Sequence, residues 1–554
     1  MEKRPWLKFW PEGIPQSIEY PEAALHELLR ASARGHPEKT AIIFEGRTLT
    51  FRELDALSDR FAAALRGTGI KQGDKVALFL PNIPQFVISF YGALKAGAVV
   101  VPCNPLYKER ELGYQLNDSG AETIVALDLL YPVAQSIRGE TQLKNCIVTN
   151  IAEYLPAFKR LIGPLLKKEL RKREFPNTLE FQEMLRKYPT EPPEVEVDPG
   201  GDVAVLQYTG GTTGISKGAM LTHQNLVSNT LQVKNWLPFT LEDIHLAVLP
   251  FFHIFGLTCA MSAPLSSANT IVLLPRFEAR KVLETIQKYG VTLFCGVPTM
   301  YIALINHPDI SRYDLTSIRK CISGAAPLPL AVMNKFNALT GGNLVEGYGL
   351  TEASPVTHCN PLDSREKVRP GSIGIPFPDT DSRIVDLEKG RKALPPGEVG
   401  ELAVRGPQVM AGYWKKPGET KNVLRRGWLL TGDIAKMDED GYFYIVDRKK
   451  DMIDAAGLKV WPREVEDVLY EHPGVREAAV IGIPDPYRGE TVKAFIALKE
   501  EYEGRVEEKE IIDFCRERIA SYKAPRVVEF RKDLPKTLVG KVLRRVLKEE
   551  EGKK

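Results

Sequence analysis

The stretch QYTGGTTGISKGAML, residues 207–221, places four glycines, three threonines and one lysine between two apolar flanks. Glycines allow positive φ and let backbone N–H groups converge on an anion. Threonine hydroxyls add donors, and a lysine adds a point charge. The stretch therefore predicts a phosphate-binding loop, made of Thr209, Gly210, Gly211, Thr212, Thr213, Gly214 and Lys217.

This loop differs from the Walker A pattern, in which a glycine immediately precedes the lysine. Here Ser216 precedes Lys217, and Gly218 follows it. Apolar residues before the loop predict a strand, and Thr222 is a residue type that opens helices, so we expect a strand–loop–helix unit. An ordinary turn is the alternative, but it would need neither three threonines nor the lysine.

Length and composition set the class of protein. A chain of 554 residues with 44% hydrophobic and 26% charged residues predicts a globular protein of two or more domains. A net charge of +3 provides no case for nucleic-acid binding. The seven cysteines form no CxxC pair, which argues against a zinc site and favours a reducing compartment. With no apolar core in the first 15 residues, we expect no secretory signal and a cytoplasmic location.

Two segments bear on membranes. Residues 86–103 are long enough to span a bilayer, but Gly92, Lys95 and Gly97 interrupt them. We therefore expect a buried helix ending at Gly97, followed by a strand, and no membrane span. Residues 157–175 are strongly basic and intermittently apolar. They predict either a solvated helical hairpin or a peripheral patch that contacts anionic membrane, with a Gly-Pro pair expected to break a continuous helix.

Alternating apolar runs and helical patterns predict an α/β fold with parallel, helix-covered sheets in the first part of the chain. The expected strands lie at 75–81, 98–102, 123–127, 145–150, 203–209, 243–250, 270–275 and 292–298. From about residue 370, short strands between glycine and proline turns predict a small antiparallel β unit. The remainder predicts a small, mobile α+β domain, giving expected domains of 1–447 and 448–554, divided at the charged run 446–451.

Further motifs suit a nucleotide. In EGYGLTE, residues 346–352, Tyr348 can stack on a purine, Thr351 can bond a phosphate oxygen, and Glu352 can hold Mg²⁺. Asp433, at the end of an apolar run, can bond a ribose diol. Lys541 follows a glycine near the C-terminus. Taken singly, these are also ordinary turn or surface residues.

As an ordered set, YTGGTTGISKG, EGYGLTE, TGD, DRKKD, GLKVWPREVE and KTLVGK resemble the adenylate-forming superfamily of acyl-CoA synthetases, adenylation domains and luciferases. The resemblance covers nearly the whole chain. Within the superfamily, LPFFHIFGL (249–257), GVPTMY (296–301) and SGAAPLP (323–329) most resemble the fatty acyl-CoA synthetases, or long-chain fatty acid–CoA ligases.

The resemblance implies a two-step reaction with ATP, Mg²⁺ and coenzyme A. A fatty acid carboxylate attacks the α-phosphate of ATP and releases pyrophosphate, and CoA then displaces AMP from the acyl-adenylate. It implies that Lys541 bridges carboxylate and α-phosphate, that Thr351 contacts the α-phosphate, and that Glu352 and Thr209 bind Mg²⁺. It further implies that Lys450 is the hinge of a rotating C-terminal domain, and that Gly457 lies on the CoA side.

Two more groups of residues take their roles from the resemblance. Those implied to bind adenine and ribose are Gly324, Ala325, Glu346, Gly347, Tyr348, Gly349, Asp433 and Arg448. Those implied to line the acyl pocket are His253, Gly296, Thr299 and Ser323.

The chain departs from the family pattern at Ser216, where many members have proline, and at Asp454, where many have lysine. Other functions stay open at this point. They are a stand-alone adenylation enzyme that loads a carrier protein, a luciferase-like oxygenase, and a nucleotide-regulated lipid-binding protein without turnover. The acyl chain length and the oligomeric state, monomer or homodimer, are equally open.

Overall fold

The computed structural model describes residues 4–209, 216–455, 458–485, 489–537 and 542–552. The chain divides into two compact units. Unit 1 comprises Met1–Lys8, Ser382–Val404 and Leu430–Lys554, and unit 2 comprises Phe9–Asp381 and Arg405–Leu429. Seven expected site residues lie outside the described residues: Gly210, Gly211, Thr212, Thr213, Gly214, Gly457 and Lys541.

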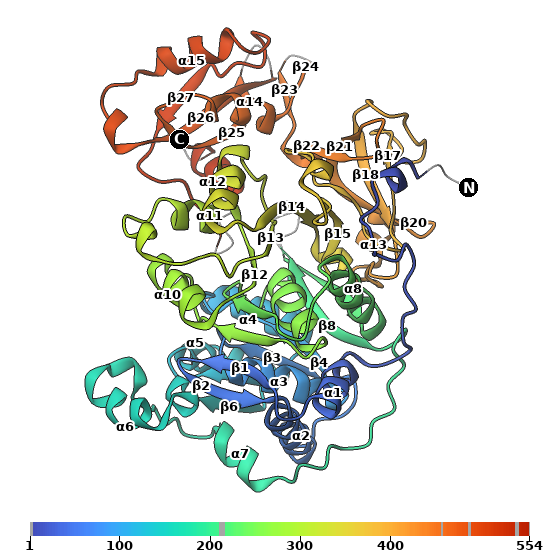
Figure 1. Ribbon diagram of the computed structural model, residues 1–554, viewed down its shortest axis with the longest axis vertical. Coiled ribbons are helices and arrows are strands. Elements are labelled where there is room, and N and C mark those ends of the chain that lie inside the picture. Colours follow the sequence, from blue (N-terminus) through green and yellow to red (C-terminus); the bar gives the residue numbers. More distant parts are fainter. Residues whose placement is uncertain (1–3, 210–215, 456–457, 486–488, 538–541, 553–554) are drawn as a thin grey trace. The chain divides into compact units, whose positions relative to one another are not determined.

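The first sheet of unit 2 has eight strands, of which six run parallel (Figure 1). Their order is β19 (Gly412–Tyr413), β9 (Lys217–Thr222), β8 (Val203–Thr209), β4 (Val99–Pro102), β3 (Lys75–Phe79), β5 (Thr123–Leu127), β6 (Asn145–Thr149) and β7 (Leu179–Glu180). The pairs β8–β9 and β9–β19 are antiparallel. The apolar runs predicted as parallel strands are confirmed here, since β3, β4 and β5 carry almost wholly buried side chains and β8 is buried at its centre.

The second sheet of unit 2 has nine strands, with a parallel centre and antiparallel edges. Their order is β16 (Ile375–Pro376), β15 (Val356–Cys359), β14 (Asn343–Gly349), β13 (Lys320–Ser323), β12 (Leu293–Gly296), β10 (Ile244–Ala247), β11 (Thr270–Leu273), β1 (Thr40–Phe44) and β2 (Arg47–Thr50). The expected strands at 243–250, 270–275 and 292–298 lie side by side in this sheet.

The helices of unit 2 lie on and around the two sheets, as Figure 1 shows. They are α1 (Leu25–Gly35), α2 (Phe51–Gly67), α3 (Pro84–Lys95), α4 (Glu109–Ser119), α5 (Tyr131–Ser136), α6 (Ala157–Leu166), α7 (Phe181–Lys187), α8 (His223–Trp236), α9 (Ala263–Leu265), α10 (Ala279–Tyr289), α11 (Pro298–Ile305), α12 (Leu330–Thr340) and α13 (Pro417–Val423). A π-helix spans Gly256–Ser262. None of the helices in the described parts of the chain is long and apolar enough to cross a membrane.

The apolar segment 86–103 is a buried helix and a buried strand, as the sequence predicts. Every residue of α3 is buried, and the chain leaves the helix through Gly97, whose φ is +75°. Lys95, the charge that interrupts the segment, contacts Asp55 at 2.5 Å and Asp59 at 2.7 Å on α2. A buried lysine is tolerated here because two carboxylates compensate its charge.

The phosphate-loop prediction is correct in its strand and its helix but wrong in their connection. β8 ends at Thr209, yet the chain next forms β9, which pairs back on β8 with Thr209 opposite Lys217. Only then does α8 begin, with the Thr222 hydroxyl accepting the Asn225 N–H as its cap. The unit is therefore strand–loop–strand–helix. KGAMLT is buried along most of its length but carries no polar–apolar alternation that would have predicted this extra strand.

Unit 1 contains antiparallel strands and a small α+β unit. The strands are β17 (Asp381–Val385), β18 (Gly400–Arg405), β21 (Trp428–Met437) and β22 (Phe443–Arg448), and the two-residue β20 (Leu424–Arg425) pairs with the start of β21 in unit 2. The α+β unit has β24 (Leu458–Val460), β23 (Ile453–Ala455), β26 (Gly489–Leu498) and β25 (Val475–Asp485), with β27 (Val527–Phe530) on β26. Its helices are α14 (Pro462–Tyr470), α15 (Glu508–Arg516) and α16 (Arg544–Glu551). The domain boundary at 447/448 stays a prediction, since unit 1 also includes strands that precede it.

Candidate active site

The expected adenine residues of unit 2 and the expected acyl residues Gly296 and Ser323 gather at one edge of the nine-stranded sheet. The parallel strands β12, β13 and β14 end next to one another, and their register pairs Gly296 with Ser323 and Ser323 with Glu346. The Gly324 N–H donates to the Gly296 carbonyl at 3.1 Å. Ligands of α/β proteins bind at the carboxyl ends of parallel strands, where loops diverge. The edge is therefore the place where the fold offers a binding site.

Tight backbone packing shapes this edge around Tyr348. A β-carbon on Gly347 would lie 2.9 Å from Ile322 Cγ2, and one on Gly349 would lie 2.4 Å from the Pro355 carbonyl oxygen. Only glycine fits such approaches without displacing its neighbours. Between them, the Tyr348 ring packs edge-on against His358, with ring centroids 5.9 Å apart. The two glycines thus let β14 carry the aromatic ring at the sheet edge.

Polar groups of the expected acyl pocket differ in their surroundings. Ser323 is fully buried, and its hydroxyl has no hydrogen-bond partner among the described residues. His253 is half-buried, and its Nδ1 accepts the Phe255 N–H at 3.2 Å. Thr299 is exposed on the first turn of α11. Because an orphaned buried hydroxyl is costly, Ser323 is the group here that most needs a ligand.

Ser216 lies at the base of the β8–β9 hairpin. Its hydroxyl donates to the Thr209 carbonyl at 2.8 Å, and its own carbonyl accepts the Tyr114 hydroxyl at 2.8 Å. Proline at this position would lack the hydroxyl that makes the first bond. The departure from the family pattern therefore has a local role, because it ties the two ends of the loop together.

Tyr413 contacts both the expected magnesium ligand, Glu352, and the loop lysine, Lys217. The Tyr413 hydroxyl donates to Glu352 Oε1 at 2.6 Å, and Lys217 Nζ lies 5.4 Å from the centre of the Tyr413 ring. Lys217 is also paired with Glu419, at 2.7 Å. Burial and the Glu352 charge raise the pKa of Tyr413 above its usual value, so the hydroxyl keeps its proton and donates.

Sequence reasoning missed both Tyr413 and Glu419. Tyr413 lies in MAGYW, a segment expected only to belong to the antiparallel β unit, whereas β19 pairs with β9 beside the phosphate hairpin. An aromatic residue between Gly412 and Trp414 was a weak signal in itself. No feature of the sequence indicated Glu419, because it contacts Lys217, which lies 202 residues earlier in the chain.

The site suits a metal ion whose ligands come largely from a bound substrate. No group of three or more histidine, cysteine or acidic side chains that could hold a metal occurs among the residues described. Mg²⁺ is commonly bound by one or two carboxylates together with substrate phosphate oxygens. Glu352, held in place by Tyr413, fits that kind of site.

In unit 1, the expected ribose residues pair across a β-ribbon. Asp433 on β21 faces Arg448 on β22, and Asp433 Oδ1 lies 2.9 Å from Arg448 Nε. Asp433 is buried while Arg448 is partly exposed. Lys450, the expected hinge, lies in a single 3-10 turn, Lys449–Asp451, directly after β22.

Asp454, the second departure from the family pattern, is exposed on β23 opposite Lys459 of β24. Its N–H donates to Glu490 at 2.9 Å. The short β23–β24 ribbon thus sets an acidic and a basic residue side by side where many family members have a lysine.

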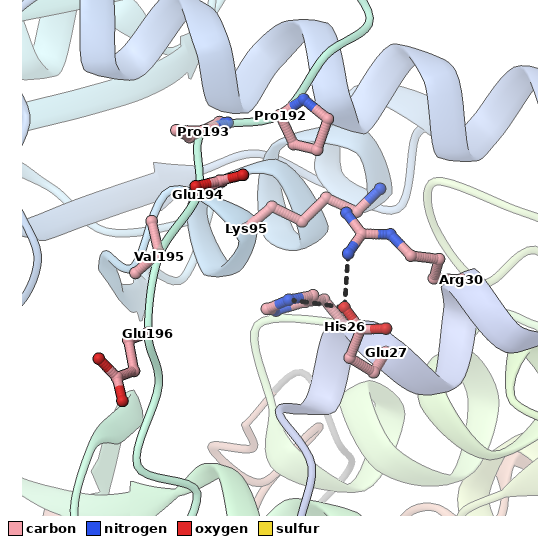
Figure 2. Close-up of a pocket in the computed structure, with 9 residues that line it drawn as sticks. All are labelled: His26, Glu27, Arg30, Lys95, Pro192, Pro193, Glu194, Val195 and Glu196. Carbon is pink, nitrogen blue, oxygen red and sulfur yellow. Dashed lines mark hydrogen bonds and ion pairs between the residues drawn. The ribbon is translucent and has the colours of Figure 1, made fainter.

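A separate pocket of unit 2 contains none of the expected site residues (Figure 2). It lies between α1, the end of α3 and the extended segment 192–196, with His26, Arg30 and Lys95 on one side and Glu194 and Glu196 on the other. Burial lowers the pKa of His26, so its imidazole is neutral near pH 7. Arg30 and Lys95 form ion pairs with acidic side chains of α1 and α2, which indicates a structural role for this part of the pocket.

Comparison with known proteins places the chain in a family. Residues 29–414 match the family model described as AMP-binding enzyme, and residues 464–541 match its C-terminal domain. The sequence is 48% identical to a long-chain-fatty-acid–CoA ligase of Bacillus subtilis over 99% of this chain and 98% of that protein. The chain belongs to the AMP-binding enzymes, which confirms the predicted membership of the adenylate-forming superfamily.

Solved structures agree with this assignment. An anthranilate CoA ligase in complex with anthranoyl-AMP matches with a TM-score of 0.86 and 31% identity, covering 96% of this chain and 98% of that one. A fatty acyl CoA synthetase of Mycobacterium tuberculosis matches with a TM-score of 0.73 and 30% identity, covering 96% and 99%. The predicted fold class is confirmed.

Proposed function

We propose that this protein joins a long-chain fatty acid to coenzyme A at the expense of ATP. In the first step the acid's carboxylate attacks the α-phosphate and expels pyrophosphate, and in the second the CoA thiol attacks the acyl carbonyl and expels AMP. Support comes from the 48% identical relative, whose name specifies a long-chain fatty acid and CoA. Among structural features, the contact of Lys217 and Glu352 with one tyrosine carries the proposal.

The polyphosphate end of ATP is proposed to lie on the β8–β9 hairpin. Like-charge repulsion between a carboxylate and a polyphosphate must be neutralised for the first step. Lys217 supplies a cation, and Glu352 with Thr209 would hold Mg²⁺, which screens the phosphate charges. Because Glu419 already pairs with Lys217, this ion pair must loosen for the lysine to contact a phosphate. Thr351 and Lys541 are proposed to act at the α-phosphate.

The nucleoside end is proposed to use two sets of residues. Tyr348, with the backbone at Gly324, Ala325, Glu346, Gly347 and Gly349, would contact adenine. Glu346 is suited to support this edge, because its carboxylate accepts the Leu328 N–H at 3.1 Å and so fixes the segment after Ala325. Asp433 would accept both ribose hydroxyls, with Arg448 orienting its carboxylate.

The acyl chain is proposed to run from His253 past Gly296, Thr299 and Ser323. The glycine is suited to this course, because a β-carbon on Gly296 would lie 3.0 Å from the Phe294 ring and would narrow the space. Long-chain acids partition into membranes, so we also propose that the protein makes peripheral contact with a lipid surface through residues 157–175.

The function is tested by incubating the protein with ATP, Mg²⁺, CoA and a panel of carboxylic acids while AMP and thioester are measured. We expect equal amounts of AMP and acyl-CoA, with the highest kcat/KM for long-chain acids. Formation of AMP without thioester from every acid would contradict transfer to CoA and favour the loading of a carrier protein. Binding of fatty acid without AMP would favour a lipid-binding protein.

The two-step scheme with Lys450 as hinge is tested by Lys541→Ala. We expect this variant to lose adenylation, yet to form acyl-CoA from supplied acyl-adenylate and CoA at the unaltered rate. Equal loss of both half-reactions would show that one arrangement of the protein serves both steps. Gly457→Leu is expected to have the reverse effect, since Gly457 is assigned to the CoA side.

A further inference from the structure

Helix α6 exposes a row of large apolar side chains. Phe158, Leu161 and Leu165 are 73%, 79% and 77% exposed, more than any other large apolar side chain in the described part of the chain. Their spacing of three and four residues places them on one face of the helix. Burying such residues in protein is the rule, so an exposed row of this kind marks an interaction surface.

Exposed basic side chains lie on α6 and in the segment that follows it. Arg160, Lys167, Lys168, Arg171, Lys172 and Arg173 are all exposed. Lys172 contacts Glu180. The only acidic residues between positions 157 and 175 are Glu169 and Glu174. An apolar row with exposed cations in the same segment is complementary to a surface that is anionic outside and apolar beneath, and an anionic lipid layer has this chemistry.

The fold holds α6 outward, as Figure 1 shows at the edge of unit 2. Lys159, on another side of the helix, donates to the carbonyl and the carboxylate of Glu45, at 3.0 and 2.9 Å. Gly163 allows Leu170 to pack against the helix, because a β-carbon there would lie 2.7 Å from Leu170 Cδ1. The prediction that Gly163 and Pro164 break the helix is wrong, since α6 continues to Leu166. Pro164 lies eight residues into a ten-residue helix, where the helix still accommodates it.

We propose that the outer face of α6 docks on an anionic lipid surface, with Phe158, Leu161 and Leu165 entering the boundary between headgroups and acyl chains. The inference rests on the membrane contact in the proposed function and names the surface that makes it. At ten residues α6 is about 15 Å long, half the hydrocarbon thickness of a bilayer, so it lies in the membrane plane. The basic side chains contact lipid phosphates.

The test measures co-sedimentation of the full-length protein with vesicles of phosphatidylcholine, with and without phosphatidylglycerol. We expect binding to the anionic vesicles that weakens with salt. The variant F158S/L161S/L165S is expected to lose at least about tenfold in vesicle partition. The variant R160Q/K167Q/K168Q is expected to lose about fivefold per removed charge, and only on anionic vesicles.

A matched control is L106S/L241S/L330S, which replaces three other exposed leucines of unit 2. It should bind vesicles like the unaltered protein. Failure of the unaltered protein to bind anionic vesicles, or unchanged binding by F158S/L161S/L165S, would overturn the proposal. The proposal would also be overturned if F158S/L161S/L165S changed the oligomer mass but not vesicle binding, since the face would then contact a second copy.

Activity on a short, water-soluble acid separates this inference from the proposed function. F158S/L161S/L165S should retain that activity, and its loss would show that α6 acts in catalysis or folding. If the unaltered protein binds vesicles yet forms no acyl-CoA from any acid, the ligase proposal fails and the docking surface stands.

Discussion

Replacing Tyr413 with phenylalanine removes one hydroxyl while keeping the ring beside Lys217. That hydroxyl makes a 2.6 Å, charge-assisted hydrogen bond to Glu352, and Tyr413 is 8% exposed. A buried hydrogen bond to a charged group contributes about 1.5–3 kcal/mol. Loss of a group that orients a metal ligand typically weakens metal binding about tenfold to hundredfold. We therefore expect the Mg²⁺ concentration that gives half-maximal pyrophosphate release, the apparent Mg²⁺ constant, to rise by this factor.

The assay follows pyrophosphate release at saturating ATP and fatty acid while Mg²⁺ is varied. Tyr20→Phe is the matched control, because the Tyr20 hydroxyl donates to Asp379 at 2.8 Å and so loses the same type of bond elsewhere in unit 2. We expect Tyr20→Phe to leave the Mg²⁺ constant unchanged. If Tyr413→Phe also leaves it unchanged while raising the KM for ATP, then Tyr413 acts through Lys217 and the assignment of Glu352 to the metal is wrong.

Four further changes have defined outcomes. Glu419→Gln releases Lys217 from its ion pair and should lower the KM for ATP severalfold in initial-rate assays; a higher KM would show that the pair itself orients the lysine. Ser216→Ala removes the bond across the loop base and should lower the free energy of unfolding by about 1 kcal/mol, with a raised KM for ATP. Lys95→Ala removes the cation nearest to the partly buried Asp55 and the buried Asp59 and leaves Asp59 only its longer contact with Arg30, so urea unfolding should show a loss of about 3 kcal/mol. Burial lowers the pKa of His223 to about 3 from 6.5, so its contribution to stability is present above pH 6.5 and is lost as the pH falls toward 3. Below pH 6.5, His223→Gln should therefore reduce the loss of the free energy of unfolding by about 1.4 kcal/mol per pH unit. An unchanged pH dependence would contradict this.

Buried strands and the main helix boundaries could be predicted because their signals are local. VAVLQYT at 203–209 matches β8 residue for residue, and the α8 cap at Thr222 follows from the residue type. β9 was missed because six residues between a loop and a helix carry too little periodicity to separate strand from turn. In 157–175 only the point at which the helix ends was wrong, since α6 runs past Gly163 and Pro164 to Leu166, and a general rule about proline within helices does not describe one placed near a helix end.

Candidate residues of the sheet edge were predictable because each belongs to a motif of several residues. Glu346, Tyr348 and Glu352 lie within seven residues of one another, and the glycines between them already indicated close backbone approach. Tyr413 and Glu419 could not be found in this way. Their contacts with Glu352 and Lys217 join segments 61 and 202 residues apart, and nothing in either segment alone identifies its partner.

By itself, the sequence determined the class of fold and the membership of the adenylate-forming superfamily, because both depend on short patterns of residue type. Only the tertiary structure decided that Ser216 ties the loop ends together, that Tyr413 joins the loop lysine to the expected metal ligand, and that α6 exposes its apolar row. Each of these depends on which surfaces long-range packing buries and which it leaves open, and packing is a property of the whole chain.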